Sequence, residues 1–371
     1  MEENLNNERE VTTKDILKHY CSSILIYGVL LSILSLSPLF YETIQESWMD
    51  YISFFIIYYL AYIIIAPVVF FIFKPKSILE SRNLAIVEYI KRQFRKNETT
   101  EEFLKNIEPT EHEKQAFMIL FIKSFFGFNC LSAIFNKYFV SPGYDIDFIK
   151  TFFVQYLQDS SNGGNLLTGF VQFIIDTGDM WLKFIVGLSM LVYAVSYLTE
   201  TEFFKNKIKS ADTTPLGVLS CIACYYPITI LTNKFIEVTP DSLLPVNNQI
   251  ILAILNLLII LVNFVSLIAV LRLGTKVGNL TNRGIVTGFP YNIIRHPDYT
   301  MQICYIILTT IPLFLMSQYS IITKIIITIA TLAWVYIYYL RAITEERHLI
   351  KDPEYQKYVE KVKYRFIPKL F

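Results

Sequence analysis

Long apolar segments separated by short charged blocks are the feature that most restricts how this chain can fold. An apolar run of roughly 18 residues or more is long enough to cross the ~30 Å hydrocarbon core of a bilayer as a helix. A helix also satisfies its own backbone hydrogen bonds where there is no water. The sequence therefore predicts an all-α, polytopic integral membrane bundle of about eight transmembrane helices. The predicted spans are residues 22–40, 51–73, 116–135, 180–198, 216–235, 250–271, 299–316 and 321–340.

The composition fits a membrane protein and gives no sign of a nucleic-acid partner. The chain is 53% hydrophobic and only 18% charged, whereas soluble domains carry about 25% charged residues. The formal net charge is +1, so the information lies in how the charge is distributed along the chain, and no nucleic-acid partner is predicted. The first twenty residues are polar and of mixed charge, unlike a cleavable signal peptide. The predicted partner is the lipid bilayer, with the first span acting as an uncleaved anchor.

The distribution of Lys and Arg predicts the topology of the chain. If all eight spans cross, one side receives 27 of the 33 Lys and Arg residues and the other side receives 2. Because positively charged loops stay on the cytoplasmic side, both termini are predicted to be cytoplasmic. The sequence does not indicate which membrane holds the chain. The basic side comprises residues 1–21, 74–115, 199–215, 272–298 and 341–371.

The chain is predicted to have two parts. Residues 1–215 form an N-terminal membrane region with four spans and a charged loop, 74–115, in which segments 81–94 and 101–107 are predicted to be helical. This region carries no catalytic constellation, and it is a candidate surface for membrane-complex partners. Residues 216–371 hold four spans, a cytosolic helical tail and nearly all of the chemically suggestive side chains.

The cysteines and histidines do not predict a redox or metal site. Cys221 and Cys224 have redox-motif spacing, but they lie in an apolar span rather than at a strand–helix junction, so both are interpreted as packing residues. The four histidines have no metal-site spacing, so no metal is predicted. Asp176, Asp179 and Lys183 are expected to pair at the membrane boundary, because a buried charge needs a partner.

Two polar blocks flank the hairpin formed by the last two predicted spans. One block precedes span 299–316 and the other follows span 321–340. Only about four residues separate the two spans, so the outer ends of the hairpin must lie near each other on the basic side. The residues expected to converge there are Arg295, His296, Tyr299, Arg341, Glu345 and Glu346.

The motifs in these blocks resemble the isoprenylcysteine carboxyl methyltransferase and phospholipid methyltransferase superfamily. The matching motifs are Leu273-Gly274 with Gly278, Pro290-Tyr291, Arg295-His296-Pro297-x-Tyr299, Arg341-x-x-x-Glu345-Glu346, Tyr355-x-x-Tyr358 and Ile367-Pro368. Each motif is short, and their shared order and spacing around a hairpin make the combination specific. The resemblance covers residues ~250–371, a third of the chain. It implies an integral membrane enzyme that uses S-adenosylmethionine.

The resemblance also implies roles for individual residues. The cofactor carries an ammonium group and ribose hydroxyls, which suit carboxylates, and an adenine, which suits aromatic and backbone groups. Adjacent helical residues do not share a face, so one glutamate is expected to face the cofactor and the other a structural Arg; by resemblance Glu346 faces the cofactor. The predicted cofactor-binding residues are Tyr291, His296, Pro297, Tyr299, Glu345 and Glu346, and the predicted catalytic residues are Arg295 and Arg341.

The methyl acceptor is expected to be a lipophilic small molecule or lipidated substrate, and its reacting group stays open. A carboxylate, such as that of a prenylated cysteine, could be held by the two-point grip of the Arg341 guanidinium. A lipid amine or a phenol would instead need a base, and His296 or a glutamate is the evident source.

Two other functional classes remain from the sequence. Phe289 and Met301 stand near or at positions where the family pattern has glycine, and four additional spans precede the match. These departures favour a membrane scaffold or complex subunit built on a catalytically retired methyltransferase fold. Sterol reductases resemble the family in their last helices, so an NADPH-dependent membrane reductase is the third class.

Overall fold

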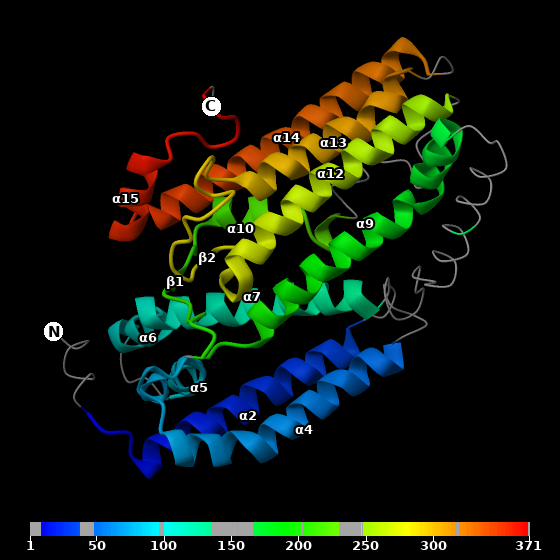
Figure 1. Cartoon of the computed structure of the whole chain (residues 1–371). Helices are drawn as coiled ribbons and strands as arrows, with labels where there is room; N and C mark the ends of the chain where they lie inside the picture. The colour runs from blue at the N-terminus through cyan, green and yellow to red at the C-terminus, as the bar shows by residue number, and fades with distance from the viewer. Residues whose placement is uncertain are drawn as a thin grey trace. The chain divides into compact units, whose positions relative to one another are not determined.

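The structure, a computed structural model, is helical through most of the chain (Figure 1). It describes residues 9–37, 48–95, 100–135, 154, 166–201, 203–229, 246, 248–315 and 319–369. Within these residues, β structure is limited to one antiparallel pair of two-residue strands. The elements are α2 (Thr13–Leu36), α4 (Trp48–Phe73), η2 (Lys76–Glu80), α5 (Arg82–Gln93), α6 (Thr100–Ile107), α7 (Glu111–Ile134), α9 (Leu166–Leu198), β1 (Ser210–Ala211), α10 (Pro215–Ile222), α12 (Gln249–Leu273), η4 (Gly274–Lys276), β2 (Thr281–Asn282), α13 (Pro297–Leu315), α14 (Ile321–Leu349) and α15 (Pro353–Lys361).

Six helices in the described part of the chain are long and apolar enough to cross a membrane: α2, α4, α7, α9, α12 and α14. Many of their large apolar side chains are exposed, such as Ile57 and Ile64 on α4 at 66% and 70%. A soluble monomer rarely leaves apolar faces of this extent in water. The chain is therefore a multi-pass, all-α membrane protein.

The chain forms two compact units, Met1–Phe128 and Asn129–Phe371, with the boundary inside α7. This boundary is set by how the residues pack. It lies earlier in the chain than residue 215, where the sequence analysis divides the chain into two parts. All the motif residues between Leu273 and Pro368 lie in the second unit.

In the first unit, α2 packs against α4 through reciprocal hydrogen bonds. Tyr20 on α2 donates its hydroxyl to the carbonyl of Ile63 on α4 at 2.6 Å, and Tyr59 on α4 donates to the carbonyl of Ile24 on α2 at 2.9 Å. Each tyrosine thus brings an apolar ring to the helix interface and gives its polar hydroxyl a partner there.

Helices α5 and α6 confirm the prediction that segments 81–94 and 101–107 are helical. The hydroxyl of Ser81 caps the first turn of α5 by accepting a backbone N–H at 3.2 Å, as Ser commonly does at a helix start. Arg92 near the end of α5 pairs with Glu113 at the start of α7 at 2.9 Å. This ion pair ties the end of α5 to the start of α7.

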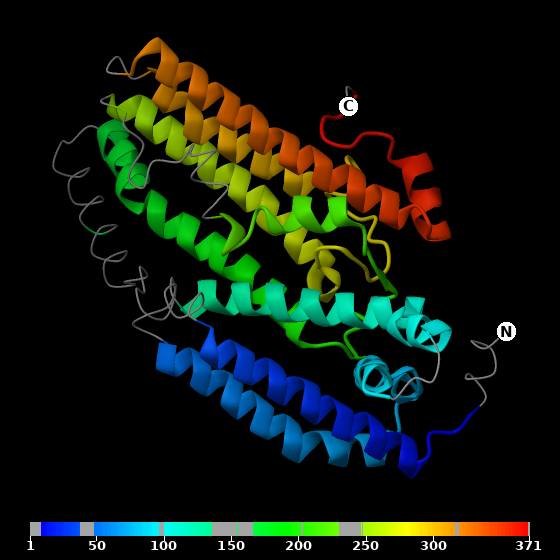
Figure 2. The same ribbon diagram turned by 180° about the vertical axis from the view of Figure 1, so that it is seen from behind.

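In the second unit, α9, α12, α13 and α14 pack side by side in that order (Figures 1 and 2). Helices α9 and α12 run parallel. Ser196 near the end of α9 donates to the carbonyl of Thr275, just beyond α12, at 2.9 Å, while Val171 and Ile174 near the start of α9 cluster with Ala253 near the start of α12. Strands β1 and β2 follow these two helices and pair at the same end.

Because α9 and α12 run parallel, the chain between them must return from one end of the bundle to the other. Helix α10 begins this return, but it ends at Ile222, and turns follow as far as Pro227. The prediction of a continuous helix over 216–235 is therefore wrong in its described part. Pro227 has no N–H to donate and its ring clashes with the preceding turn, so a helix is not expected to run through it. Residues 230–245 lie outside the described residues.

The other predicted spans correspond to helices. Helix α9 has 33 residues and begins well before the predicted span 180–198. Helix α13 has 19 residues and contains the described part of span 299–316. The predicted C-terminal helical tail is present as α15. The predicted hairpin therefore exists as α13 and α14, with the two polar blocks at its outer end.

Candidate functional site

Glu346 on α14 binds three basic side chains at the outer end of the hairpin. Its carboxylate accepts from Arg295 Nε at 2.7 Å and from Arg365 Nε at 2.8 Å, and it lies 3.1 Å from His296 Nε2. The glutamate side chain is only 12% exposed, so these bonds are strengthened by the low local dielectric. The cluster joins the segment before α13, helix α14 and the residues that follow α15, 362–369, which are called the tail from here on.

The segment before α13 also holds the tail through backbone groups. Arg295 Nη1 donates to two carbonyls of the tail at 2.7 and 2.8 Å. The N–H groups of Arg295 and His296 donate to the carbonyls of Tyr364 and Arg365 at 2.9 and 3.0 Å. Arg295 is thus occupied in fixing the tail.

Glu345, the preceding residue, has a different hydrogen-bond donor, although His296 Nδ1 also lies 4.0 Å from Glu345 Oε2. The hydroxyl of Tyr299 on α13 donates to Glu345 Oε2 at 2.7 Å. The ring of His296 stacks on that of Tyr299, with centroids 5.3 Å apart. The Glu345 side chain is 36% exposed, so this carboxylate retains accessible surface that Glu346 lacks.

Arg341 is buried one helical turn before Glu345, in an aromatic box. Its guanidinium lies over the rings of Tyr299, Tyr338 and Tyr225, at 4.8, 5.3 and 5.8 Å from their centroids. It donates to the side-chain oxygen of Asn279 at 2.9 Å. Its Nε has no hydrogen-bond partner in the described part of the structure. Arg341 therefore keeps a buried donor that a ligand could satisfy.

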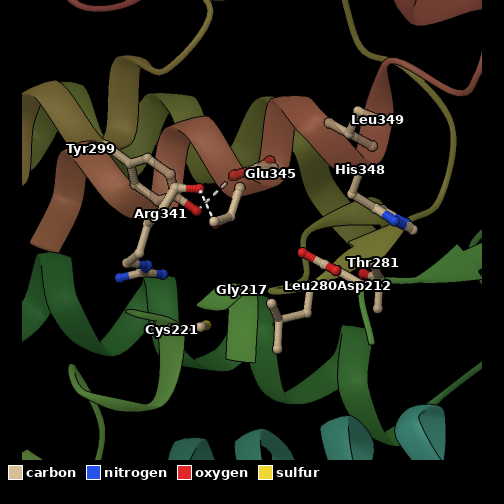
Figure 3. Close-up of a pocket in the computed structure, with 11 residues that line it drawn as sticks. Asp212, Gly217, Cys221, Leu280, Thr281, Tyr299, Arg341, Glu345, His348 and Leu349 are labelled. Carbon is tan, nitrogen blue, oxygen red and sulfur yellow. Dashed lines mark hydrogen bonds between the residues drawn. The ribbon is translucent and has the colours of Figure 1, made fainter. Parts of the chain in front are cut away.

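A small pocket of about 20 Å³ lies beside Arg341 (Figure 3). Three of the six buried side-chain polar atoms without a hydrogen-bond partner in the described residues line it: Asp212 Oδ2, Thr281 Oγ1 and Arg341 Nε. An unsatisfied buried polar group costs about 1–3 kcal/mol. Their concentration here indicates a site for a polar ligand or water. Figure 3 shows Tyr299, Arg341 and Glu345 at one end of the pocket and Asp212, Thr281 and His348 at the other.

Asp212 is held in place by the start of α10. Its Oδ1 accepts from the N–H of Thr214 at 2.9 Å, and Arg347 of α14 lies 3.7 Å from its Oδ2. A Cβ at Gly217 would overlap the Asp212 carboxylate. Because Gly217 has no side chain, the buried Asp212 carboxylate can pack directly against the first turn of α10.

A second, larger cavity of about 620 Å³ lies among α9, α12, α13, α14 and the turns after α10. Its volume is within the ~300–1,000 Å³ range of small-molecule sites. Asp179 and Lys183, which both line it, pair at 2.7 Å. This confirms the pairing expected for these two residues, whereas Asp176 accepts instead from Gln172 at 2.8 Å.

Arg341 lines both cavities, and no other described residue does so. Tyr299 and Glu345 line the small pocket with it, whereas Arg295, His296 and Glu346 line neither cavity. The predicted convergence at the end of the hairpin is therefore present in space, but it separates into a pocket-lining group and a group that fixes the tail.

Tyr291 and Pro297 have structural positions. Tyr291 lies in an apolar cluster with Tyr355 and Tyr358, and the Tyr358 hydroxyl donates to the Tyr291 carbonyl at 2.7 Å. Burial raises the pKa of all three tyrosines, so they remain protonated donors at neutral pH. Pro297 is the first residue of α13. An N–H at this position makes no intrahelical hydrogen bond, so proline costs the helix none there.

Sequence reasoning did not identify Asp212, Asn279, Thr281 or Tyr338 as site residues. The two-residue strands β1 and β2, which bring Asp212 and Thr281 together, have no local signal, since they lie about seventy residues apart in the sequence.

No group of three or more His, Cys, Asp or Glu side chains in the described part of the chain could hold a metal ion. The five cysteines are free thiols, and Cys221 and Cys224 line the small and large cavities respectively. Comparison with protein-family models, curated proteins and solved structures finds no match to this chain.

Proposed function

We propose that this chain is an integral membrane methyltransferase that uses S-adenosylmethionine and acts on a lipophilic acceptor. The observation that carries the proposal is the position of Arg341, which lines both the small pocket and the large cavity. An enzyme with one polar and one lipophilic substrate needs two compartments that meet at the reacting atoms. Arg341 lies where such a meeting point would be.

The residues of the small pocket fit the polar parts of S-adenosylmethionine. The carboxylates of Glu345 and Asp212 suit its ammonium group and ribose hydroxyls, and the ring of Tyr299 offers an aromatic face. The unsatisfied atoms of Asp212 and Thr281 mark where a polar ligand would gain hydrogen bonds. When bound, the cofactor supplies an electrophilic methyl group on a sulfonium.

The pocket must widen to admit a molecule of this size, because about 20 Å³ is room for a single water. Glu345, which lines the pocket, and Arg347, which lies beside Asp212, have side chains 36% and 47% exposed, so each has solvent to turn into. In this proposal Glu345 faces the cofactor in place of Glu346, because Glu346 already has three basic partners. Arg295 has a structural role here in place of the predicted catalytic one.

Arg341 would orient the acceptor from the wall between the cavities. Its guanidinium can donate to an oxygen of the acceptor, and the three tyrosine rings hold the guanidinium plane in position. Fixing two reactants in line can supply about 7–11 kcal/mol of the barrier reduction in favourable cases. No metal or covalent intermediate is required for this chemistry.

The proposal includes eight membrane crossings with both termini in the cytoplasm. The distribution of Lys and Arg supports it, as does the parallel course of α9 and α12, which makes the chain cross between them even though α10 is short. This crossing would include α10 and the turns that follow it, and Cys224 and Tyr225 of those turns line the large cavity. Broken helices of this kind occur in membrane proteins where they border a cavity.

The test is transfer of isotope-labelled methyl from S-adenosylmethionine to total membrane lipids by purified protein. Wild type is expected to label the lipid fraction. Arg341→Lys keeps a positive charge but loses the planar fork and the stacking on tyrosine, so its rate should fall by about tenfold or more, equivalent to one lost charged hydrogen bond. Arg95→Lys, at an exposed position, is the matched control and should keep full activity.

A second candidate function is a membrane scaffold built on a retired methyltransferase fold. The observation that favours it is the volume of the small pocket, which as it stands holds about one water. Failure of wild-type protein to bind S-adenosylmethionine and to label any lipid would favour this reading over the enzyme.

A further inference from the structure

We propose that the C-terminal end of α12 binds the headgroup of an anionic phospholipid, with the Arg272 guanidinium on the lipid phosphate. Arg272 lies in the last turn of α12 and is exposed. Neither Arg272 nor Lys276, one turn further along the chain, lines the small pocket or the large cavity. This lipid site is therefore separate from the two cavities of the proposed methyl transfer.

The Arg272 guanidinium occupies the space that a side chain at position 288 would fill. A Cβ at Gly288 would overlap its Nη2, Cζ and Nε atoms. Lys276 rests more loosely on Gly284, where a Cβ would lie 3.3 Å from its Nζ. Glycine permits this close approach to the backbone because it has no Cβ. A basic group thus lies against each end of the segment 284–288.

Both of these cations keep their hydrogen-bond donors. In the described part of the chain, the side chains of Arg272 and Lys276 form no ion pair and no hydrogen bond. The nearby Lys209 differs, because it lies 3.2 Å from Asp352 and 3.5 Å from Glu354. Lys209 therefore engages these two carboxylates, and Arg272 and Lys276 remain available to an external anion.

An exposed apolar stripe leads along α12 to Arg272. Leu257, Leu261 and Phe264 are exposed, and their helical spacing places them on the same face of α12 as Arg272. Because α12 is long and apolar enough to span a membrane, such a face meets lipid acyl chains. Arg272 lies at the end of this face, where a long basic side chain reaches the headgroups.

Exposed aromatic rings lie at the same end of α12. Thr275 Oγ1, just beyond the helix, donates to the carbonyl of Phe204 at 3.0 Å and so holds the loop after α9 against this end. Phe203 in that loop is 87% exposed, and Phe289, next to Gly288, is exposed as well. Apolar rings with this exposure are typical of surfaces that contact the boundary between headgroups and acyl chains.

An anionic phospholipid complements both parts of this surface. Its phosphate can accept the two-point hydrogen bonding of the Arg272 guanidinium, and Lys276 adds a second positive charge that attracts an anionic headgroup. Its acyl chain can lie along the apolar stripe. A soluble phosphate ester would satisfy the cations but would leave the stripe and Phe289 without a ligand.

The experiment uses the purified full chain in dodecyl maltoside micelles. It measures saturable binding of fluorescent phosphatidylglycerol and of fluorescent phosphatidylcholine with the same acyl chains. Wild type should bind phosphatidylglycerol about tenfold or more tightly, since one charged hydrogen bond is worth at least this factor. Arg272→Gln should remove most of this preference. Lys357→Gln, the matched control, removes a charge at an exposed position of α15 and should keep it.

Gly288→Ala distinguishes a positioned guanidinium from a surface that is simply basic. This variant keeps every charge but displaces the Arg272 guanidinium, so it should lower the preference about as far as Arg272→Gln does. Added to Arg272→Gln it should have little further effect, because two changes that act on one contact are not additive. If Arg272 and Lys276 served only to set membrane orientation, Gly288→Ala would leave the preference unchanged.

Equal binding of the two lipids by wild type would overturn the proposal, and so would an undiminished preference in Arg272→Gln or in Gly288→Ala. Displacement of phosphatidylglycerol by an equal concentration of glycerol 3-phosphate would assign the site to a soluble phosphate ester and would overturn the lipid as occupant. None of these measurements involves S-adenosylmethionine, so lipid preference and methyl transfer can fail separately.

Discussion

Glu345 and Glu346 are consecutive residues of α14, yet their carboxylates serve different parts of the molecule. Glu345 accepts a hydrogen bond from Tyr299 at 2.7 Å and lines the small pocket, whereas Glu346 pairs with Arg295 at 2.7 Å and lines neither cavity. An α-helix has 3.6 residues per turn, so two consecutive side chains project about 100° apart around its axis. One acidic pair thus supplies both a pocket-lining group and a structural one.

The structural role of Glu346 predicts a large loss of stability in Glu346→Gln. Removing one member of a buried, multiply paired charge cluster typically costs about 3–5 kcal/mol. The tail should also become accessible, because Arg365 and Arg295 lose their shared partner. Denaturant titration in detergent and tryptic cleavage after Lys361 and Lys363 would measure the two effects.

The matched control for this variant is Glu354→Gln. Glu354 is 68% exposed and lies 3.5 Å from Lys209, so its removal should cost at most about 1 kcal/mol. Equal stability loss in the two variants would show that the Glu346 cluster does not fix the tail.

Asp352 predicts a pH-dependent contribution to the stability of α15. Burial acts to raise the pKa of its carboxyl, but hydrogen bonds from Asn282 and from the N–H of Glu354, with the nearby Lys209, bring the pKa below the ordinary value of 3.8. A lowered folded-state pKa stabilises the fold above the unfolded value, and that contribution disappears as the pH falls through the folded value.

Denaturant titrations of wild type and Asp352→Asn between about pH 7 and pH 2.5 would measure this linkage. The difference in unfolding free energy should be constant at neutral pH and should shrink below about pH 4 as the wild-type carboxyl is protonated. A difference that stays constant throughout would show that the ionised form of Asp352 is not what stabilises α15.

The proposed topology predicts opposite accessibility for the two ends of the second unit. Gln249 at the start of α12 and Glu360 in α15 are both exposed. With Cys21 replaced, a membrane-impermeant thiol reagent added to sealed vesicles should label Gln249→Cys and Glu360→Cys from opposite sides. Labelling of both from one side would exclude an odd number of crossings between them, and with it the eight-span arrangement.

The sequence predicted those features of the fold that depend on local patterns. Apolar runs of membrane length identified α2, α4, α7, α9, α12 and α14, because a lipid environment demands helices of that length. The short connection between α13 and α14 was enough to predict that Arg341 approaches Tyr299, which the structure has at 4.8 Å from guanidinium to ring.

Features that depend on tertiary packing were not predictable. The apolar composition of 216–235 hid the end of α10 at Ile222, since hydropathy does not report where backbone leaves a helix. The choice between Glu345 and Glu346 depends on Arg365, which reaches Glu346 at 2.8 Å from the C-terminal tail. No spacing rule connects a tail residue to a particular face of α14.

If the small pocket binds S-adenosylmethionine, as proposed, isothermal titration calorimetry on the purified chain will detect the binding. Wild type should bind S-adenosylmethionine and not NADPH. Glu345→Gln should weaken that binding by about 1.5–3 kcal/mol, roughly 10- to 150-fold, while Tyr299→Phe, which leaves the carboxylate in place, should change it much less. Absence of S-adenosylmethionine binding at millimolar concentrations, or binding of NADPH in its place, would contradict the account.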